Sequence, residues 1–388
     1  MNIESTYILN TLRRCTRCTL PETHETIMFD REGVCNVCRN ADDKKTKVDW
    51  DDRQRQLKTL VDSFKGKGEY DCIVPFSGGK DSTFTLYYIV RELGMRPLVV
   101  SFDHGFYRPR TLENNERTMR KLGVDFLKVR TDWHLVRKLM LESLKRKGDF
   151  DWHAHVGLFV QPIQAAVRYK IPLLFWGEPS SEYTAYYSYD EIEEFDVKRH
   201  HKLNDLGIAA EDMVGFLGEG VSMRDFAPYL IPEPSALRTL GLRSLCLGSY
   251  IPWDVRSQHE ISKRELGWQG DDVEGVPPQY PYEKIEYQLQ GPRDYLKFTK
   301  RGYSRVSHLT SIDIRNGRMT REEAKKLIEE YEGMRPASLD YILPILGITE
   351  DEWRSIAVAQ AIPPYVHDFS NERKGKPLWD MHLWEQNP

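Results

Sequence analysis

The residues best suited to chemistry in this 388-residue chain form the segment Ser77 to Ser82, which reads Ser-Gly-Gly-Lys-Asp-Ser. Two adjacent glycines let the backbone turn tightly and bring its N–H groups close to an anion. An apolar run, Asp71 to Phe76, precedes the turn and a helical pattern follows it, so a helix N-terminus adds positive charge there. Lys80 supplies a mobile cation, and Asp81 suits a magnesium ion held between it and phosphate. The segment therefore predicts a phosphate-binding turn.

This turn is not a Walker A loop. Val74 stands where that motif needs glycine, and Asp81 stands where it needs serine or threonine. Two glycines alone would also fit a tight strand-to-helix turn that binds nothing. The matching residues on either side of the glycines favour the phosphate-binding interpretation.

Four cysteines form a second constellation. Cys15 and Cys18 make one C-x-x-C pair, and Cys35 and Cys38 make another, with sixteen residues between the pairs. This spacing is typical of a four-thiolate Zn²⁺ site, which is structural rather than catalytic. An iron–sulfur cluster or a redox pair is the alternative.

The other two cysteines lie in apolar runs. We expect Cys72 to be a core residue of a strand, because buried thiols behave as small hydrophobes. Cys246 also has apolar neighbours, and a sulfur-carrying role for it is the alternative to burial.

Composition limits the classes of function. The chain has 59 acidic and 55 basic residues, so it has no global positive field and nucleic acid is an unfavoured partner. No apolar run approaches the length of a membrane span, and Met1 to Arg14 has no signal-peptide core. We therefore expect a cytoplasmic protein with no membrane partner.

Strands and helices alternate from Tyr70 to about Ser181, which predicts an α/β fold with a parallel sheet covered by helices on both faces. Helical patterns return from Thr320, with capping boxes at Thr320/Glu323 and Thr349/Glu352. The predicted domains are a four-cysteine zinc region (1–45), an ATP-binding domain (53–185), a loop-rich substrate-binding region (186–310) and a helical C-terminal region (311–388).

The segment Ser77 to Ser82 resembles the SGGxDS signature of the PP-loop (ATP pyrophosphatase) superfamily, whose fold is adenine nucleotide alpha hydrolase-like. Members of that superfamily cleave ATP between its α and β phosphates. The resemblance implies ATP and Mg²⁺ as cofactors, with pyrophosphate on the loop, adenine at the end of the second strand and ribose or phosphates near the fourth. The implied nucleotide-binding residues are Phe76, Ser77, Gly78, Gly79, Lys80, Asp81, Ser82, Phe102, Asp103 and Gly177.

Over nearly its whole length the chain resembles the N-acetyl sugar amidotransferases of bacterial surface-polysaccharide and nonulosonic acid pathways. Besides the cysteines, the resemblance rests on Phe29-Asp30, 33–38, 70–75, 247–254, 301–305 and 315–320. That family converts an acetamido group of a nucleotide-linked N-acetyl sugar into an acetamidino group, using ATP and ammonia. The implied partner is a two-part glutaminase like the subunits of imidazole glycerol phosphate synthase.

Candidate substrate contacts lie between Tyr250 and Arg305. Tyr250 and Trp253 could stack on a sugar face, while Arg301 and Arg305 could bind a carboxylate or a nucleotide diphosphate. The alternative is that the aromatic residues belong to the core and the arginines are solvated surface charges.

Four residues are candidates for catalysis: Lys80 and Asp81 with magnesium, and Glu178 and Asp254 as bases that deprotonate ammonium. For each base, an ordinary structural role is the alternative. His153 and His155 have no metal-ligand context, and we interpret them, with His200 and His201, as surface or packing histidines.

The chain has no recognisable glutaminase of its own, since Asn2 follows Met1 and neither Cys72 nor Cys246 lies in a glycine-rich elbow. We therefore expect ammonia to come from a partner. Two other functions stay open. A PP-loop tRNA thiolation enzyme would need a basic surface and an exposed cysteine, and a zinc-stabilised nucleotide-binding adaptor would bind ATP without turnover.

Overall fold

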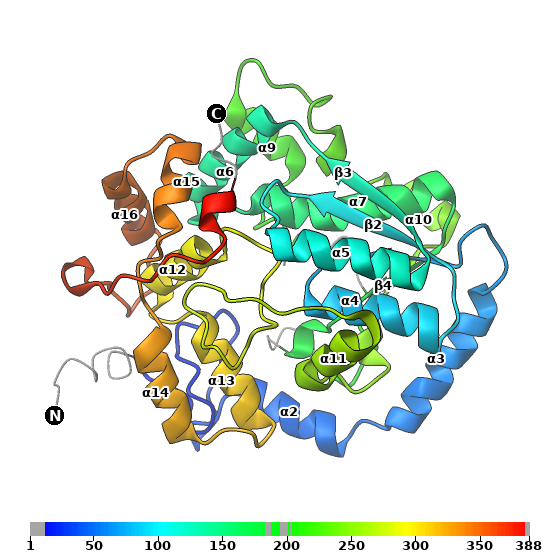
Figure 1. The fold of residues 1–388 in the computed structure, drawn as a ribbon, viewed down its shortest axis with the longest axis horizontal. Helices are drawn as coiled ribbons and strands as arrows, with labels where there is room; N and C mark the ends of the chain where they lie inside the picture. The colour runs from blue at the N-terminus through cyan, green and yellow to red at the C-terminus, as the bar shows by residue number, and fades with distance from the viewer. Residues whose placement is uncertain (1–11, 183–187, 195–200, 202–203, 385–388) are drawn as a thin grey trace.

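A five-stranded parallel sheet lies between helices in the computed structural model, which describes residues 12–182, 188–194, 201 and 204–384 (Figure 1). The strand order is β3-β2-β1-β4-β5. The order reverses between β1 and β4, and in folds of this kind ligands bind beside such a reversal, at the carboxyl ends of the strands. The strands are β1 (Cys72–Pro75), β2 (Pro97–Asp103), β3 (Asp125–Arg130), β4 (Leu173–Trp176) and β5 (Arg243–Cys246).

Helices cover both faces of the sheet, as the alternating pattern predicts. Cys72 and Val74 of β1 face a cluster that includes α4 (Lys80–Tyr87) and α5 (Pro109–Leu122). Ile73, between them, faces the opposite cluster, which includes α7 (Trp152–Tyr169). A central strand buried on both sides explains why β1 and β2 are apolar at nearly every position. The predicted fold class is confirmed.

The N-terminal half of the chain matches its predicted elements closely. Helix α3 (Trp50–Phe64) precedes the sheet, and the helix expected after the phosphate loop comprises α4 and a π-helical turn over Tyr88–Glu92. Helix α6 (Trp133–Lys147), which follows β3, ends at Gly148 with φ +56°. Glycine adopts this left-handed conformation without steric cost, so the helix stops there.

The region expected to be loop-rich contains more regular structure than predicted. It adds β5 to the edge of the sheet, two helices before β5, and α11 (Val255–Ile261) and α12 (Gln290–Arg301) after it. The boundary drawn at residues 185 and 186 lies outside the described residues. The earlier helices are α9 (Ala210–Leu217) and α10 (Pro234–Leu240).

The C-terminal region is helical from residue 290 rather than from 320. Both predicted capping boxes are present, at Thr320 and at Thr349. Side chains of α12, α15 and α16 pack against α6 in one hydrophobic cluster, which joins this region to the sheet domain. The helices are α12 (Gln290–Arg301), α13 (Arg305–Arg315), α14 (Arg321–Tyr331), α15 (Leu339–Leu346) and α16 (Glu350–Ala359).

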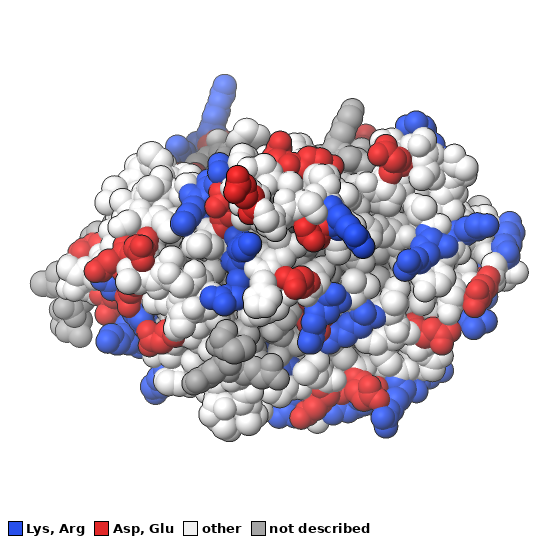
Figure 2. Space-filling model, turned by 90° about the horizontal axis from the view of Figure 1, so that it is seen from above, with Lys and Arg blue, Asp and Glu red and all other residues white. Residues whose placement is uncertain are grey.

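Charges of both signs are mixed on the surface. On the face shown in Figure 2, Lys and Arg side chains lie interspersed with Asp and Glu rather than forming one continuous basic area. Within the described residues, no helix is both long enough and apolar enough to cross a membrane.

Candidate active site at the phosphate loop

The phosphate loop joins β1 to α4 at the point where the strand order reverses. Gly78 has φ +85°, and a Cβ there would lie 2.2 Å from Asn115 Oδ1, so glycine is required both by conformation and by space. The backbone N–H groups of Ser77 and Gly78 donate to Ser82 Oγ at 3.3 and 3.1 Å. Both N–H groups point at the Ser82 hydroxyl. A phosphate oxygen bound in the same place could accept both hydrogen bonds.

Lys80 is buried behind the loop in a network of charges. Its Nζ donates to Asp81 Oδ2 at 2.8 Å and to Glu283 Oε2 at 2.9 Å. Burial would raise the pKa of Glu283, but Lys80 and Arg305 outweigh it and lower that pKa to about 2. Glu283 therefore stays ionised and holds the Lys80 ammonium beside the phosphate loop.

A further carboxylate, Glu286, lies directly over the loop. A Cβ on Gly79 would lie 2.9 Å from Glu286 Oε2. Asp81 Oδ1 and Glu286 Oε2 are both buried, and neither oxygen has a hydrogen-bond partner among the described residues. Buried carboxylate oxygens without partners beside a phosphate loop fit the ligand chemistry of Mg²⁺, so Asp81 and Glu286 are the residues that would hold that ion. No local pattern points to Glu283 or Glu286, which lie about two hundred positions from the loop.

Gly177 lies beside the first turn of α4. A Cβ there would lie 2.7 Å from Thr85 Oγ1 and 3.4 Å from the Asp81 backbone oxygen, so only glycine allows this approach. Glu178 follows it and is half-buried. The structure thus brings the end of β4 against the phosphate-loop helix, in agreement with the position predicted for these two residues.

Three of the expected nucleotide-binding residues, Phe76 before the loop and Phe102 and Asp103 near adenine, lie deeper than a ligand contact requires. Phe76 and Phe102 are each 1% exposed, and Phe102 packs against α7 and Tyr229. Asp103 pairs with Lys128 at 2.9 Å and Arg130 at 2.5 Å. Burial would raise the pKa of Asp103, but these cations lower it. The side chains of all three residues thus have structural contacts, and only their backbone atoms remain for a nucleotide.

Tyr250, Trp253 and Asp254 have the structural roles that were the alternative to binding. Tyr250 and Trp253 belong to the main hydrophobic cluster, where Trp253 packs on Phe84. Asp254 caps α11 and accepts from Arg318 Nη2 at 2.6 Å. Burial would raise the pKa of Asp254, yet the Arg318 guanidinium lowers it, which makes this carboxylate a weak base.

Arg301 and Arg305 are partly buried and hydrogen-bonded to other residues, so they are not the solvated surface charges of the alternative interpretation. Arg305 donates to Glu283 Oε1 at 3.3 Å and to Asp294 Oδ1 at 3.5 Å. Lys80, Glu283 and Arg305 therefore form a continuous line of charges from the phosphate loop to α13. Arg301 lies farther along, where it donates to the Thr23 backbone oxygen at 2.6 Å.

Two histidines contact cations of α12. His155 Nε2 accepts from Arg293 Nη2 at 2.7 Å, and His308 Nε2 lies 3.0 Å from Lys297 Nζ. His155 is thus part of a charged cluster, whereas His153 is fully buried, as a packing histidine would be. His200 lies outside the described residues, and His201 is exposed. The spacing of Arg293, Lys297 and Arg301 at i, i+4 and i+8 was the signal that could have revealed the cluster.

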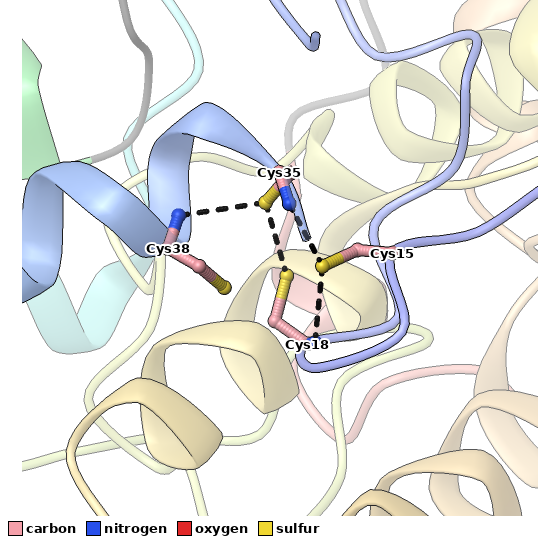
Figure 3. A group of neighbouring side chains, drawn as sticks. All are labelled: Cys15, Cys18, Cys35 and Cys38. Carbon is pink, nitrogen blue, oxygen red and sulfur yellow. Dashed lines mark hydrogen bonds between the residues drawn. The ribbon is translucent and has the colours of Figure 1, made fainter. Parts of the chain in front are cut away.

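The four cysteines of the N-terminal region lie together and point toward one another (Figure 3). Their sulfur atoms all lie within 4.8 Å of one another, and Cys18 Sγ is 3.5 Å from Cys35 Sγ. A tetrahedral metal with bonds of about 2.3 Å needs sulfurs about 3.8 Å apart. Backbone N–H groups of Cys35 and Cys38 donate to sulfurs of the cluster, which stabilises thiolates. The residues therefore fit a four-thiolate metal site.

Cys72 and Cys246 are both buried, as expected from their apolar neighbours. Burial raises the pKa of the Cys72 thiol, which keeps it protonated. Cys246 ends β5, and its Sγ lies 3.5 Å from Glu193 Oε1. A buried thiol in this position is unsuited to carrying sulfur to an external substrate.

Residues 280–382 match the model of a protein family described as the C-terminal domain of LPS biosynthesis protein WbpG-like proteins. The resemblance to surface-polysaccharide biosynthesis proteins is confirmed over this segment. Among curated proteins, an uncharacterized protein of Methanocaldococcus jannaschii, MJ1599, is 24% identical over 135 residues, which are 34% of this chain and 47% of that protein. The match thus spans about half the length of that relative.

Three solved structures show weaker likenesses. NMN synthetase of Francisella tularensis has a TM-score of 0.28 at 11% identity, over 60% of this chain and all of that one. NH3-dependent NAD synthetase of Campylobacter jejuni has a TM-score of 0.28 at 12% identity, over 58% and 100%. U34-tRNA thiolase NcsA of Methanococcus maripaludis, with its [4Fe-4S] cluster, has a TM-score of 0.26 at 13% identity, over 72% and 91%. Such scores carry no weight for the function of this chain.

The WbpG-like segment supplies the charges around the phosphate loop. Glu283, which binds Lys80, and Glu286, which lies over Gly79, both belong to it. So does Arg305, which continues the line of charges. The segment shared with LPS biosynthesis proteins is therefore joined directly to the loop with the PP-loop signature.

Proposed function

We propose that this protein is an ATP-dependent amidotransferase that converts the acetamido group of a nucleotide-linked N-acetyl sugar into an acetamidino group. The observation that carries the proposal is the contact between Lys80 of the phosphate loop and Glu283 of the WbpG-like segment. It joins a loop suited to pyrophosphate to a segment shared with polysaccharide biosynthesis proteins.

The proposed reaction has two steps. The amide oxygen of the acetamido group attacks the α-phosphorus of ATP, the bond to the β-phosphate breaks, and pyrophosphate leaves. Ammonia then attacks the activated carbon, and AMP departs with the former amide oxygen. This route fits the chemistry because an amide oxygen is a poor leaving group until it is adenylated.

The residues of the loop supply what the first step needs. Pyrophosphate gains charge as it leaves, and Lys80 with the loop N–H groups would stabilise that charge. Magnesium, held by Asp81 and Glu286, would neutralise phosphate charge in the same place. Glu283 keeps the Lys80 ammonium oriented, since the two groups are 2.9 Å apart and buried.

Ammonia would come from a separate glutaminase, resembling the subunits of imidazole glycerol phosphate synthase. The two cysteines outside the four-cysteine site are buried, so neither is placed to act as a glutaminase nucleophile. The base that deprotonates ammonium would be Glu178, because Arg318 already holds the alternative, Asp254, in an ion pair. The metal of the four-cysteine site would be Zn²⁺, in a structural role.

The test is turnover with ATP, magnesium, heavy-nitrogen ammonium and a panel of UDP- and CMP-linked N-acetyl sugars. Mass spectrometry should find AMP, pyrophosphate and a sugar in which labelled nitrogen has replaced the acetamido oxygen. Reactions without ammonium or without sugar are the controls and should give no amidinated sugar.

Two results would contradict this assignment. Formation of ADP instead of AMP would exclude adenylation. Failure with every sugar, together with tight tRNA binding at physiological salt, would favour the thiolation enzyme instead, although the burial of Cys246 opposes that alternative.

A further inference from the structure

One face of α12 carries three cations; the first, Arg293, pairs with Asp151 at 3.1 Å, whereas the other two share one carboxylate. Arg293, Lys297 and Arg301 follow one another at intervals of one helical turn, and the N-terminal loop between the two cysteine pairs lies against the last two. Lys297 Nζ is 3.1 Å and Arg301 Nε 3.5 Å from the same oxygen, Glu25 Oε1. One carboxylate therefore serves two cations.

The same carboxylate also accepts a hydrogen bond from the Tyr303 hydroxyl. Burial lowers the pKa of Lys297, and repulsion from Arg305 and Arg301 acts in the same direction against the attraction of Glu25. Lys297 and Arg301 nevertheless stay 27% and 21% exposed, so a ligand could reach them. The cluster would gain stability from a second anion.

A buried histidine completes the cluster with an unused donor. The His24 side chain is 5% exposed, and its Nδ1 accepts from the Thr26 backbone N–H at 3.3 Å. The proton of the neutral ring is thus on Nε2, which has no hydrogen-bond partner among residues 12–182, 188–194, 201 and 204–384. The His24 ring centroid lies 5.3 Å from that of His308, and a ligand atom of each residue lies within 4.8 Å of a Glu25 oxygen.

These side chains would suit an anion better than a metal ion. The geometry of His24, Glu25 and His308 alone would allow a metal ligand set. The Lys297 ammonium, however, lies 3.0 Å from His308 Nε2 and 3.1 Å from Glu25 Oε1, in the space that a cation would need. The ammonium donates to both atoms, and two positive charges in this position would repel each other.

We infer that Lys297, Arg301 and His24 form a binding site for an oxyanion of the acceptor, either the diphosphate or a carboxylate of the sugar. The inference rests on the proposed function only in assigning this anion to the acceptor. Arg305 lies between this site and the phosphate loop, through its contact with Glu283. The acceptor would thus be held by its anion while its acetamido group faces the α-phosphate of ATP.

The inference gives the four-cysteine region a second role. Thr23, His24 and Glu25 lie between Cys18 and Cys35, and Thr23 Oγ1 and its backbone oxygen both bond to Arg301. Folding of the cysteine region would therefore complete the oxyanion site.

The experiment is calorimetric titration of protein saturated with magnesium and α,β-methylene ATP, which fills the phosphate loop. UDP, CMP and glucuronate are the probes, because they separate phosphate from carboxylate recognition. Lys297→Gln and Arg301→Gln should each weaken the bound probe about 10-fold or more, the size expected for one charged hydrogen bond. Lys297→Arg should restore most of the affinity, and Lys326→Gln, at an exposed position of α14, should leave it unchanged.

The inference fails if no probe binds the wild-type protein, or if Lys297→Gln and Arg301→Gln bind every probe as the wild type does. It also fails if these substitutions weaken the ATP analogue as much as the probes, since the cluster would then belong to the nucleotide site. If probe binding depends on Lys297 but the protein never forms AMP, the oxyanion site stands. Only the proposed amidotransferase function is then contradicted.

Discussion

The phosphate loop and the cationic face of α12 are built in opposite ways. The loop uses six consecutive residues, Ser77 to Ser82, on a single strand–turn–helix unit. The cationic face combines α12 with a loop that is distant in sequence, since Arg301 and its partner Thr23 are 278 positions apart. The phosphate-binding turn is therefore local in sequence, although Glu283 and Glu286 reach it from a remote segment, whereas the proposed acceptor site is built entirely from remote segments that fold together.

This difference implies different sensitivities. Damage to the cysteine region should affect the acceptor side and leave the loop intact, whereas damage to the loop should do the reverse.

Loss of the four-cysteine site should have the largest effect. Cys18→Ser removes one of four thiolates, and metal binding of this kind contributes on the order of 10 kcal/mol to folding. We expect loss of bound metal, protease sensitivity of residues 12–46 and loss of UDP binding, while the ATP analogue still binds. Cys246→Ser is the matched control and should retain metal. A Cys18→Ser protein with unchanged metal content would contradict the assignment.

Replacement of Lys80 should act on the other region. Lys80→Gln removes the cation that faces departing pyrophosphate, and we expect AMP formation to slow by about 100- to 1000-fold. Affinity for UDP should change by less than about 2-fold, because Lys80 lies at the ATP phosphate loop and not at the proposed oxyanion site. Quenched-flow measurement of AMP tests the first effect, and calorimetry tests the second. Equal losses in both would mean that the two regions are one site.

Glu283 connects the two regions and should make stability depend on pH. Its pKa falls from 4.5 to about 2 in the folded protein because of Lys80 and Arg305. The stabilisation is therefore complete above pH 4.5 and is lost as the pH falls toward 2. Glu283→Gln should unfold at lower denaturant concentration than the wild type at pH 7, and the difference should shrink below pH 4.5. A difference that is constant with pH would contradict the ion pair.

A substitution at Gly78 should give the smallest effect. Gly78→Ala places a Cβ in the left-handed region and 2.2 Å from Asn115, at a cost of about 2 kcal/mol. ATP should bind about 30-fold more weakly, with UDP binding unchanged. Gly207→Ala is a control for the conformational cost, because Gly207 has φ +70° but no atom within 4 Å of its added Cβ.

The same contrast explains how much the sequence could predict. Strands β1 to β4 and the phosphate loop were predicted, because periodicity and the glycine turn are local signals. The cysteine site was predicted for the same reason. Strand β5 was missed because its four residues, Arg243–Cys246, are too short to show a period. Helix α12 was missed because Pro292 and Gly291 in its first turn look like a loop.

Contacts between remote residues could not be predicted. Glu283 and Lys80 are 203 positions apart in the sequence, and no pattern in either segment identifies the other residue as its partner. Tyr250 and Trp253 were considered for sugar stacking because of their type, yet both are buried in the core. Aromatic residues are enriched in cores and in binding sites alike, so residue type alone cannot separate these roles.

The central claim is that ATP activates an amide oxygen of an acceptor bound beside the phosphate loop. The most direct test uses an N-acetyl sugar nucleotide whose acetamido oxygen is a heavy isotope. Adenylation predicts that the heavy oxygen appears in the phosphate of AMP, with one label for each amidinated sugar formed. Heavy oxygen in water or in inorganic phosphate, with unlabelled AMP, would contradict the account.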